Sequence, residues 1–134
     1  KSFKGVLRGL HYQSIPCPQG KLVRCIKGTI YDVIVDIRKD SATFLEWAGI
    51  FLNPENNQQL WIPEGFAHGF LTMSDIAEVM YKTTAYWSKE YERTIKWNDP
   101  ELAIRWPNKD FQPCLSKKDI GGNLISNFKM DEFF

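Results

Sequence analysis

The sequence predicts an all-β fold, an antiparallel β-sandwich or barrel formed by residues 1–134 as a single domain. Two observations lead to this prediction. Short apolar segments of strand length recur at even spacing, and no long helical segment lies between them. The composition, with 43% apolar and 14% aromatic residues, also provides enough apolar surface for a substantial core.

The first strand is expected within Gly5–Gln13, an apolar run that contains His11. Leu22–Ile26 and Thr29–Ile37 flank Lys27-Gly28, a pattern that predicts a β-hairpin with a tight turn. The other strands are expected where polar or turn-rich segments separate further apolar runs, at Phe44–Leu52, Gln59–Ile62, Phe66–Met73 and Glu78–Thr84.

The C-terminal third is less regular than the rest of the chain. Ser88–Arg93 has the length of one helical turn, and Trp97-Asn98-Asp99-Pro100 is a turn signal. Ser116-Lys117-Lys118-Asp119 has the S-x-x-D spacing of a helix start. We therefore expect a short C-terminal helix that ends near Gly121-Gly122.

Charge and cysteine content exclude several classes of protein. Lys and Arg number 17 against 16 Asp and Glu, which gives no general reason to expect a nucleic acid or an anionic membrane as a partner. No apolar run approaches the roughly 20 residues of a membrane span, and no signal-peptide pattern opens the sequence. The three cysteines form no CxxC pair. We expect a cytoplasmic protein without disulfides.

The two histidines are the first candidates for chemistry. A neutral imidazole such as that of His11 can accept a proton near neutral pH, although a buried strand histidine bonded to backbone fits the same pattern. His68 ends Pro63-Glu64-Gly65-Phe66-Ala67-His68, whose P-x-G-x-x-H form resembles the second motif of the cupin jelly rolls. Many cupins bind a metal through three histidines and a carboxylate. With only two histidines in the chain, we expect a cupin-type jelly roll without a metal.

The sequence as a whole resembles the dTDP-4-dehydrorhamnose 3,5-epimerase family. The likeness covers nearly the whole chain, and members of the family usually carry a further N-terminal segment, which we expect to be missing here. It rests on seven segments in compatible order and spacing: VLRGLHYQ, QGKLVRC, VDIRKDSATF, QLWIPEGFAHGF, EVMYKTTAYW, IKWNDPELAIRWP and LSKKD.

This resemblance implies an isomerase of dTDP-rhamnose and polysaccharide biosynthesis that works as a homodimer. The implied reaction inverts C3, C5 or both in a nucleotide-linked 4-keto-6-deoxy sugar, from dTDP-4-dehydro-6-deoxy-D-glucose to dTDP-4-dehydro-L-rhamnose. The ketone beside each carbon stabilises the enolate that forms when a proton leaves, so the implied chemistry needs no cofactor. It needs a base, an oxyanion stabiliser and an acid.

Four residues match the catalytic residues of the family. His11 matches the base, and Asp119 matches the carboxylate that orients it, although Asp119 also suits a simple helix cap. Lys21 matches the cation that stabilises the negative charge on O4, and it equally suits a solvated strand end. Tyr81 matches the acid that returns a proton to the opposite face of the sugar, with a packed aromatic as the alternative.

Four further residues match positions near the substrate. Arg8 suits a diphosphate, but on a regular strand Arg8 and His11 would point to opposite faces, so we expect a bulge at Gly9. His68 matches an assisting histidine and equally suits a satisfied core residue. Tyr86 and Trp87 stand where many members have two tyrosines, and either aromatic suits stacking on the base or packing.

Three other functions remain open from the sequence. The first is a single-centre epimerase of a related nucleotide sugar, because Trp87 stands where many family members have a tyrosine. A metal-dependent cupin enzyme would need carboxylates to complete a two-histidine site. A non-catalytic sugar-binding module would keep the pocket but would have no need of His11, Lys21, Tyr81 and Asp119 together.

Overall fold

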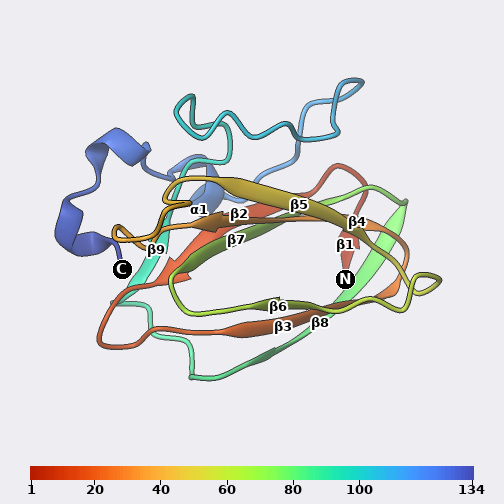
Figure 1. The fold of residues 1–134 in the computed structure, drawn as a ribbon. Coiled ribbons are helices and arrows are strands. Elements are labelled where there is room, and N and C mark those ends of the chain that lie inside the picture. Colours follow the sequence, from red (N-terminus) through yellow and green to blue (C-terminus); the bar gives the residue numbers. More distant parts are fainter.

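The computed structural model describes residues 1–134 as two antiparallel sheets packed face to face (Figure 1). The four-stranded sheet has the order β1-β8-β3-β6, and the five-stranded sheet has the order β5-β4-β7-β2-β9. The all-β, antiparallel prediction is confirmed. The strands are β1 Ser2–Phe3, β2 Leu7–Gln13, β3 Lys21–Lys27, β4 Ile30–Asp36, β5 Trp47–Leu52, β6 Leu60–Ile62, β7 Phe66–Thr72, β8 Ile76–Thr83 and β9 Glu92–Thr94.

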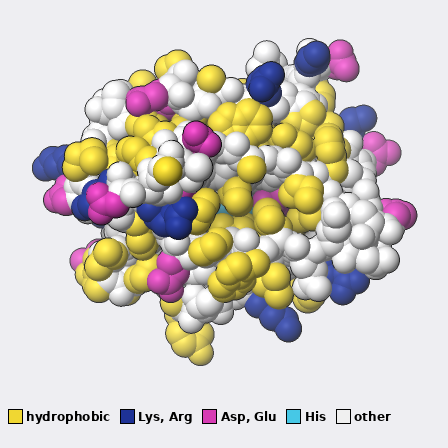
Figure 2. All heavy atoms as spheres, viewed as in Figure 1, with side chains coloured by type: hydrophobic (Ala, Val, Ile, Leu, Met, Phe, Trp, Pro, Cys, Tyr) yellow, Lys and Arg dark blue, Asp and Glu magenta, His cyan; other side chains and the backbone are white.

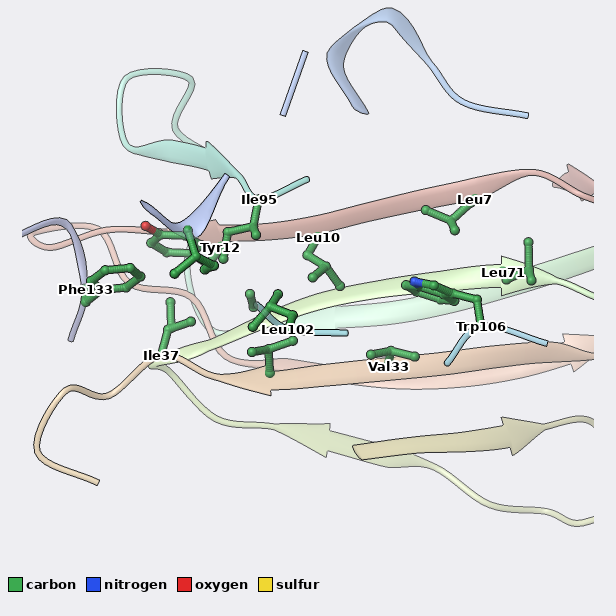
Figure 3. Packing of buried hydrophobic residues seen from close by; sticks show 13 residues of the cluster. Leu7, Leu10, Tyr12, Val33, Ile37, Leu71, Ile95, Leu102, Trp106 and Phe133 are labelled. Carbon is green, nitrogen blue, oxygen red and sulfur yellow. The ribbon is translucent and has the colours of Figure 1, made fainter. Parts of the chain in front are cut away.

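Apolar side chains form two separate cores on the two faces of the five-stranded sheet. The alternation of strand side chains divides β4 between them, since Ile30 and Val33 point to opposite faces. The core between the sheets contains Val23, Cys25, Ile30, Leu52, Ile62, Phe70 and Ala77. The core on the outer face is larger and includes Leu7, Leu10, Tyr12, Val33, Ile37, Leu71, Ile95, Leu102, Trp106 and Phe133 (Figure 3).

The chain after β9 covers the outer face of the five-stranded sheet (Figure 1). It includes helix α1 (Lys117–Ile120) and two 3-10 helices, η1 (Ile125–Asn127) and η2 (Met130–Glu132). The C-terminal end is fastened by Phe134, whose N–H donates to the Ile37 carbonyl. This covering buries the back of the sheet, so β2, β4 and β7 are held from behind. None of the helices has the length and hydropathy of a membrane-spanning segment.

The surface carries no single large charged region on the side viewed in Figure 1. Hydrophobic side chains gather over the middle of the molecule, and most Lys, Arg, Asp and Glu side chains lie towards its edge (Figure 2). Both signs of charge occur round this edge (Figure 2). The distribution agrees with the near balance of 17 basic and 16 acidic residues.

The predicted hairpin across Lys27-Gly28 is wrong. A tight turn is present and Gly28 has φ +74°, but β3 pairs with β6 and β8 while β4 pairs with β5 and β7. The turn therefore takes the chain from one sheet to the other. Val23 and Ile30 then meet in the core between the sheets. The turn residues set the local bend, whereas burial of both inner faces decides which strands pair.

The remaining elements follow the predicted ones with shifted ends. Residues 42–45 form a turn in which Leu45 has φ +65°, so the strand expected from Phe44 starts at Trp47. A turn closes where Glu92 N–H donates to the Ser88 carbonyl, but Glu92 already belongs to β9, which the sequence did not indicate. Helix α1 confirms the predicted C-terminal helix, with Ser116 as its N-cap.

Candidate active site

A pocket of about 550 Å³ opens between the two sheets and is lined mainly by polar side chains. The five-stranded sheet supplies one wall, the four-stranded sheet supplies the other, and α1 contributes at the rim. Seven of the eight residues predicted from the sequence line it: Arg8, His11, Lys21, His68, Tyr81, Trp87 and Asp119. Residues that lie far apart in the sequence are thus brought to one cavity.

A bulge in β2 brings Arg8 and His11 to the same pocket, as the sequence predicted. In the ladder with β7, Arg8 lies opposite Phe70 and His11 lies opposite His68, so three steps on β2 match two on β7. Gly9 lies within this irregularity with φ +120°, and a Cβ there would come 2.6 Å from the Gly69 Cα. Only glycine fits this close approach of the two backbones.

His11 is paired with a carboxylate from the far end of the chain. Its Nε2 lies 2.7 Å from Oδ1 of Asp119, which α1 places behind the imidazole. Burial raises the pKa of Asp119, but hydrogen bonds from His11, Ser116 and the Gly9 N–H outweigh it and lower that pKa to about 2. An ionised carboxylate on one nitrogen fixes the tautomer of His11 and leaves the other nitrogen free to accept a proton.

Lys21 and Tyr81 come from the opposite wall. Tyr81 on β8 lies opposite Val23 on β3, and Val23 and Lys21 are two residues apart, so all three share the inner face of the four-stranded sheet. Burial lowers the pKa of Lys21, while Glu92 and Asp32 oppose that effect. Tyr81 keeps 61% of its surface exposed, which places its side chain at the open side of the pocket.

His68 forms a second histidine–carboxylate pair on the same wall as His11. Its Nε2 hydrogen-bonds Oδ2 of Asp32 at 3.0 Å, and both side chains are buried. His68 is thus a satisfied buried residue that also lines the pocket, and its assisting role stays a prediction. Sequence reasoning missed Asp32. It could have been found from its place between Ile30 and Ile34 on the inward face of a strand. Burying a carboxylate there without a partner would cost free energy, so a partner was to be expected.

The rim of the pocket is formed by residues that follow β8 and by α1. Trp87 lines the pocket, whereas the Tyr86 side chain is 98% exposed and lies outside it. A contact of Tyr86 with a nucleotide stays a prediction. Lys118 and Glu92 also line the pocket and form a 2.8 Å ion pair. Burial alone would raise the pKa of Glu92. The hydrogen bond and the positive charge of Lys118 have the larger combined effect, so the pKa is lowered.

The pocket-lining residues missed by sequence reasoning include Gln19, Glu92, Ser116 and Lys118. Gln19 donates to the Ala85 carbonyl at 2.7 Å and so ties the segment before β3 to the segment after β8. Polar residues at the ends of strands and helices are common on every protein surface. Their residue types therefore do not distinguish them from ordinary surface residues, and the sequence could not predict their place in the pocket. No group of three or more His, Cys, Asp or Glu side chains is arranged to hold a metal ion.

Comparisons with known proteins find close relatives of this sequence and fold. The sequence model described as dTDP-4-dehydrorhamnose 3,5-epimerase matches residues 1–127. The chain is 59% identical over 122 residues to a dTDP-4-dehydrorhamnose 3,5-epimerase of Shigella flexneri, a match that covers 91% of this chain and 66% of that protein. The chain spans about two thirds of the length of the curated relatives it matches.

Two solved structures illustrate the range of similar folds. The chain superposes with a TM-score of 0.93 and 48% identity on a dTDP-6-deoxy-D-glucose-3,5-epimerase from Legionella pneumophila in complex with dTDP-4-keto-L-rhamnose, covering 98% of this chain and 69% of that one. A 3'-monoepimerase from Streptomyces bikiniensis in complex with dTDP-quinovose gives a TM-score of 0.88 and 34% identity, covering 93% and 63%. Similar folds therefore occur in single-centre and double-centre epimerases.

Proposed function

Because the chain belongs to the dTDP-4-dehydrorhamnose 3,5-epimerase family, we propose that it epimerises C3 and C5 of a dTDP-linked 4-keto-6-deoxy sugar. The proposed substrate is dTDP-4-dehydro-6-deoxy-D-glucose, and the product is dTDP-4-dehydro-L-rhamnose. The proposed chemistry uses side chains of the protein and the ketone of the substrate. It requires no transfer of electrons to a cofactor.

One observation carries the proposal: His11 and Tyr81 line the same pocket from opposite sheets. A sugar ring held between the sheets would meet a base on one face and a proton donor on the other. Inversion at a carbon needs this arrangement, since a proton that returns from the side it left restores the starting sugar. A pure binding module has no need of a paired base and an opposed acid.

The proposed mechanism has two proton transfers at each carbon. His11 takes the proton beside the ketone, and the electron pair of the broken C–H bond moves into an enolate whose charge lies on O4. Lys21 stabilises that oxygen; because burial lowers its pKa, it gives up a proton to a developing oxyanion more readily than a solvated lysine would. Tyr81 then protonates the carbon from the other face.

Arg8 is the proposed contact for the diphosphate. Arg8 lines the pocket, and its Nε donates to the Ser2 hydroxyl at 3.3 Å. A guanidinium offers a fork of donors that matches pairs of phosphate oxygens. Lys118 at the rim and Lys21 on the opposite wall add two further cations to the same pocket.

The direct test is to follow dTDP-4-dehydro-6-deoxy-D-glucose by proton NMR in deuterium oxide with the purified protein. Deuterium at C3 and C5 with inversion at both is the expected result. His11→Ala should abolish incorporation while the circular dichroism spectrum stays unchanged. Absence of exchange at both carbons with the wild-type protein would overturn the proposal.

A single-centre epimerase is the second candidate, and Trp87 is the observation that favours it. Its indole lines the pocket at a position where the family resemblance leads us to expect a tyrosine. An indole is bulkier than a phenol and carries a donor but no acceptor. Label and inversion at one carbon only in the same NMR experiment would identify this activity, and Trp87→Tyr would then be expected to add exchange at the other carbon.

We also propose that the protein forms a homodimer through the outer face of the four-stranded sheet. This face presents an unusual number of exposed apolar side chains for a sheet facing water, namely Phe3, Ile26, Trp61, Ile76 and Met80. Light scattering after gel filtration should give twice the monomer mass of 15.6 kDa. Met80→Glu, which puts a charge in the middle of this face, should shift the protein towards monomer.

A cytoplasmic location is the last part of the proposal. Its support is that Cys17, Cys25 and Cys114 are all free thiols. Unpaired cysteines suit a reducing compartment. Fractionation of the native host followed by immunodetection would test it, and recovery outside the cytoplasm would contradict it.

A further inference from the structure

Beyond the groups that touch the substrate, we propose that Ser116 is a positioning residue whose hydroxyl holds the Asp119 carboxylate in the orientation that pairs with His11. Ser116 lines the rim of the pocket as the N-cap of α1. The inference rests on the proposed function for its kinetic consequence, but the contact itself is tested without substrate.

The two oxygens of the Asp119 carboxylate have separate partners. Oδ1 accepts from the Gly9 N–H at 3.1 Å and contacts His11 Nε2 at 2.7 Å. Oδ2 accepts from the Ser116 hydroxyl at 2.5 Å, and this is the only hydrogen bond that reaches it. Because Asp119 is only 2% exposed, water is a poor substitute for this donor. The carboxylate is thus fixed at both ends and does not turn about its Cβ–Cγ bond.

The direction of the Ser116 hydroxyl is fixed by a second bond. Its oxygen accepts from the Asp119 backbone N–H at 3.2 Å, so its single proton is left for Oδ2. One serine therefore caps the helix and orients the carboxylate. Helix α1 has only four residues, too few to be stable by its own backbone bonds, so side-chain contacts must hold it against β2.

The other charged groups around this carboxylate do not duplicate the contact. Arg8 on β2, Lys21 on β3, Glu92 on β9 and Lys118 on α1 line the same pocket. Lys118 is engaged by Glu92 at 2.8 Å, and none of these side chains hydrogen-bonds Asp119. Loss of the Ser116 hydroxyl would leave Oδ2 buried without a donor, which disfavours the ionised form that His11 needs.

The experiment compares three substitutions at Ser116 with a matched control. Ser116→Thr keeps both the cap and the hydroxyl donor. Ser116→Gly keeps most of the capping ability but removes the donor, and Ser116→Ala removes both. Ser41→Ala is the control, because the Ser41 hydroxyl donates in the same way to the carboxylate of Asp36 at 2.6 Å and neither residue lines the pocket.

Two readouts separate positioning from simple helix capping. In the kinetic assay, Ser116→Gly and Ser116→Ala should both lower kcat about 10- to 100-fold with little change in KM, while Ser116→Thr and Ser41→Ala stay near the wild type. In the free protein, the labelled Asp119 carboxyl carbon should titrate at higher pH in Ser116→Gly and Ser116→Ala than in the wild type. Its titration should be unchanged in Ser41→Ala.

Two results would overturn the inference. An unchanged Asp119 titration in Ser116→Ala would show that the hydroxyl does not hold the carboxylate. A loss of turnover in Ser116→Ala but not in Ser116→Gly would assign the serine to capping alone. If the wild-type protein itself exchanges no sugar proton, the proposed function fails, and the titration still decides whether Ser116 orients Asp119.

Discussion

His11 on β2 and His68 on β7 lie directly opposite each other in one antiparallel ladder, and each is paired with a buried carboxylate. Opposite residues in such a ladder share a face of the sheet, so the two imidazoles stand side by side on one wall of the pocket. Asp119 approaches His11 from α1, and Asp32 approaches His68 from β4. The wall therefore carries two histidines whose orientations are set independently.

Asp119→Asn should leave the fold intact and reduce kcat strongly. The amide has the shape of the carboxylate but no charge, so it neither fixes the same tautomer of His11 nor stabilises the imidazolium formed after proton abstraction. We expect a loss of about 10³- to 10⁴-fold, measured as deuterium incorporation into the sugar. A loss smaller than that of Ser116→Ala would contradict the role of Asp119.

Tyr81→Phe should separate proton exchange from inversion. His11 remains able to remove and return a proton on its own side, so deuterium should still enter the sugar with the starting configuration retained. Inversion should fall by about 10²-fold or more because the donor on the opposite wall is gone. NMR of the labelled sugar distinguishes the two outcomes. Equal losses of exchange and inversion would instead assign Tyr81 to binding.

Lys21→Met should lower kcat by about 10²- to 10³-fold and change KM little. Methionine approximates the length of the lysine stem, so packing on β3 is retained while the cation that faces the developing oxyanion is lost. Steady-state kinetics with the dTDP sugar would measure both constants. Arg8→Met is the matched comparison: it should raise KM more than it lowers kcat, since its proposed contact is the diphosphate in both ground and transition states.

The free energy of unfolding should fall steeply in acid. The pKa values of Asp36 and Asp119 are lowered in the folded protein, Asp36 by hydrogen bonds from Arg38, Ser41 and Thr43 that outweigh its burial. A carboxyl with a lowered folded pKa adds stability above its unfolded pKa of about 3.9 and loses it as the pH falls through the folded value.

Urea unfolding between neutral pH and pH 2 would measure this dependence. Asp119 alone should account for on the order of 2 kcal/mol between neutral pH and pH 2. Asp36→Asn should lower stability at neutral pH and flatten the slope in acid, because one of the two groups no longer titrates. An unchanged slope would show that Asp36 takes no part in acid unfolding.

The sequence predicted most strands because alternating apolar residues report directly which face of a strand is buried. It failed at Lys27-Gly28, where local turn residues suggested a hairpin but the two strands bury their inner faces across the sandwich from each other. Strand pairing is decided by long-range burial, which a turn signal does not encode. The short strands β1 and β9 have too few residues to show any periodicity.

How well the sequence predicted a residue of the site depended on the kind of residue. The bulge at Gly9 followed from physical reasoning, since two useful side chains three positions apart needed an irregular strand. His11 and His68 were candidates as the only two histidines of the chain, and the other predicted residues that line the pocket were found through the family resemblance. Asp32 and Ser116 were missed because each acts through a partner that only the fold brings close. Asp32 pairs with His68, which is 36 residues away in the sequence. The Ser116 hydroxyl is relevant only because Asp119, which it contacts, pairs with His11.

The pairing of His11 with Asp119 spans 108 residues of sequence. A chain that is still being synthesised, or one that has refolded only its two sheets, would carry the base without the carboxylate that orients it. Catalytic activity should therefore return in a refolding experiment only after the far-ultraviolet circular dichroism signal of the sheets has been recovered. Turnover would then report on the docking of α1, a late event that optical probes of the sheets do not register.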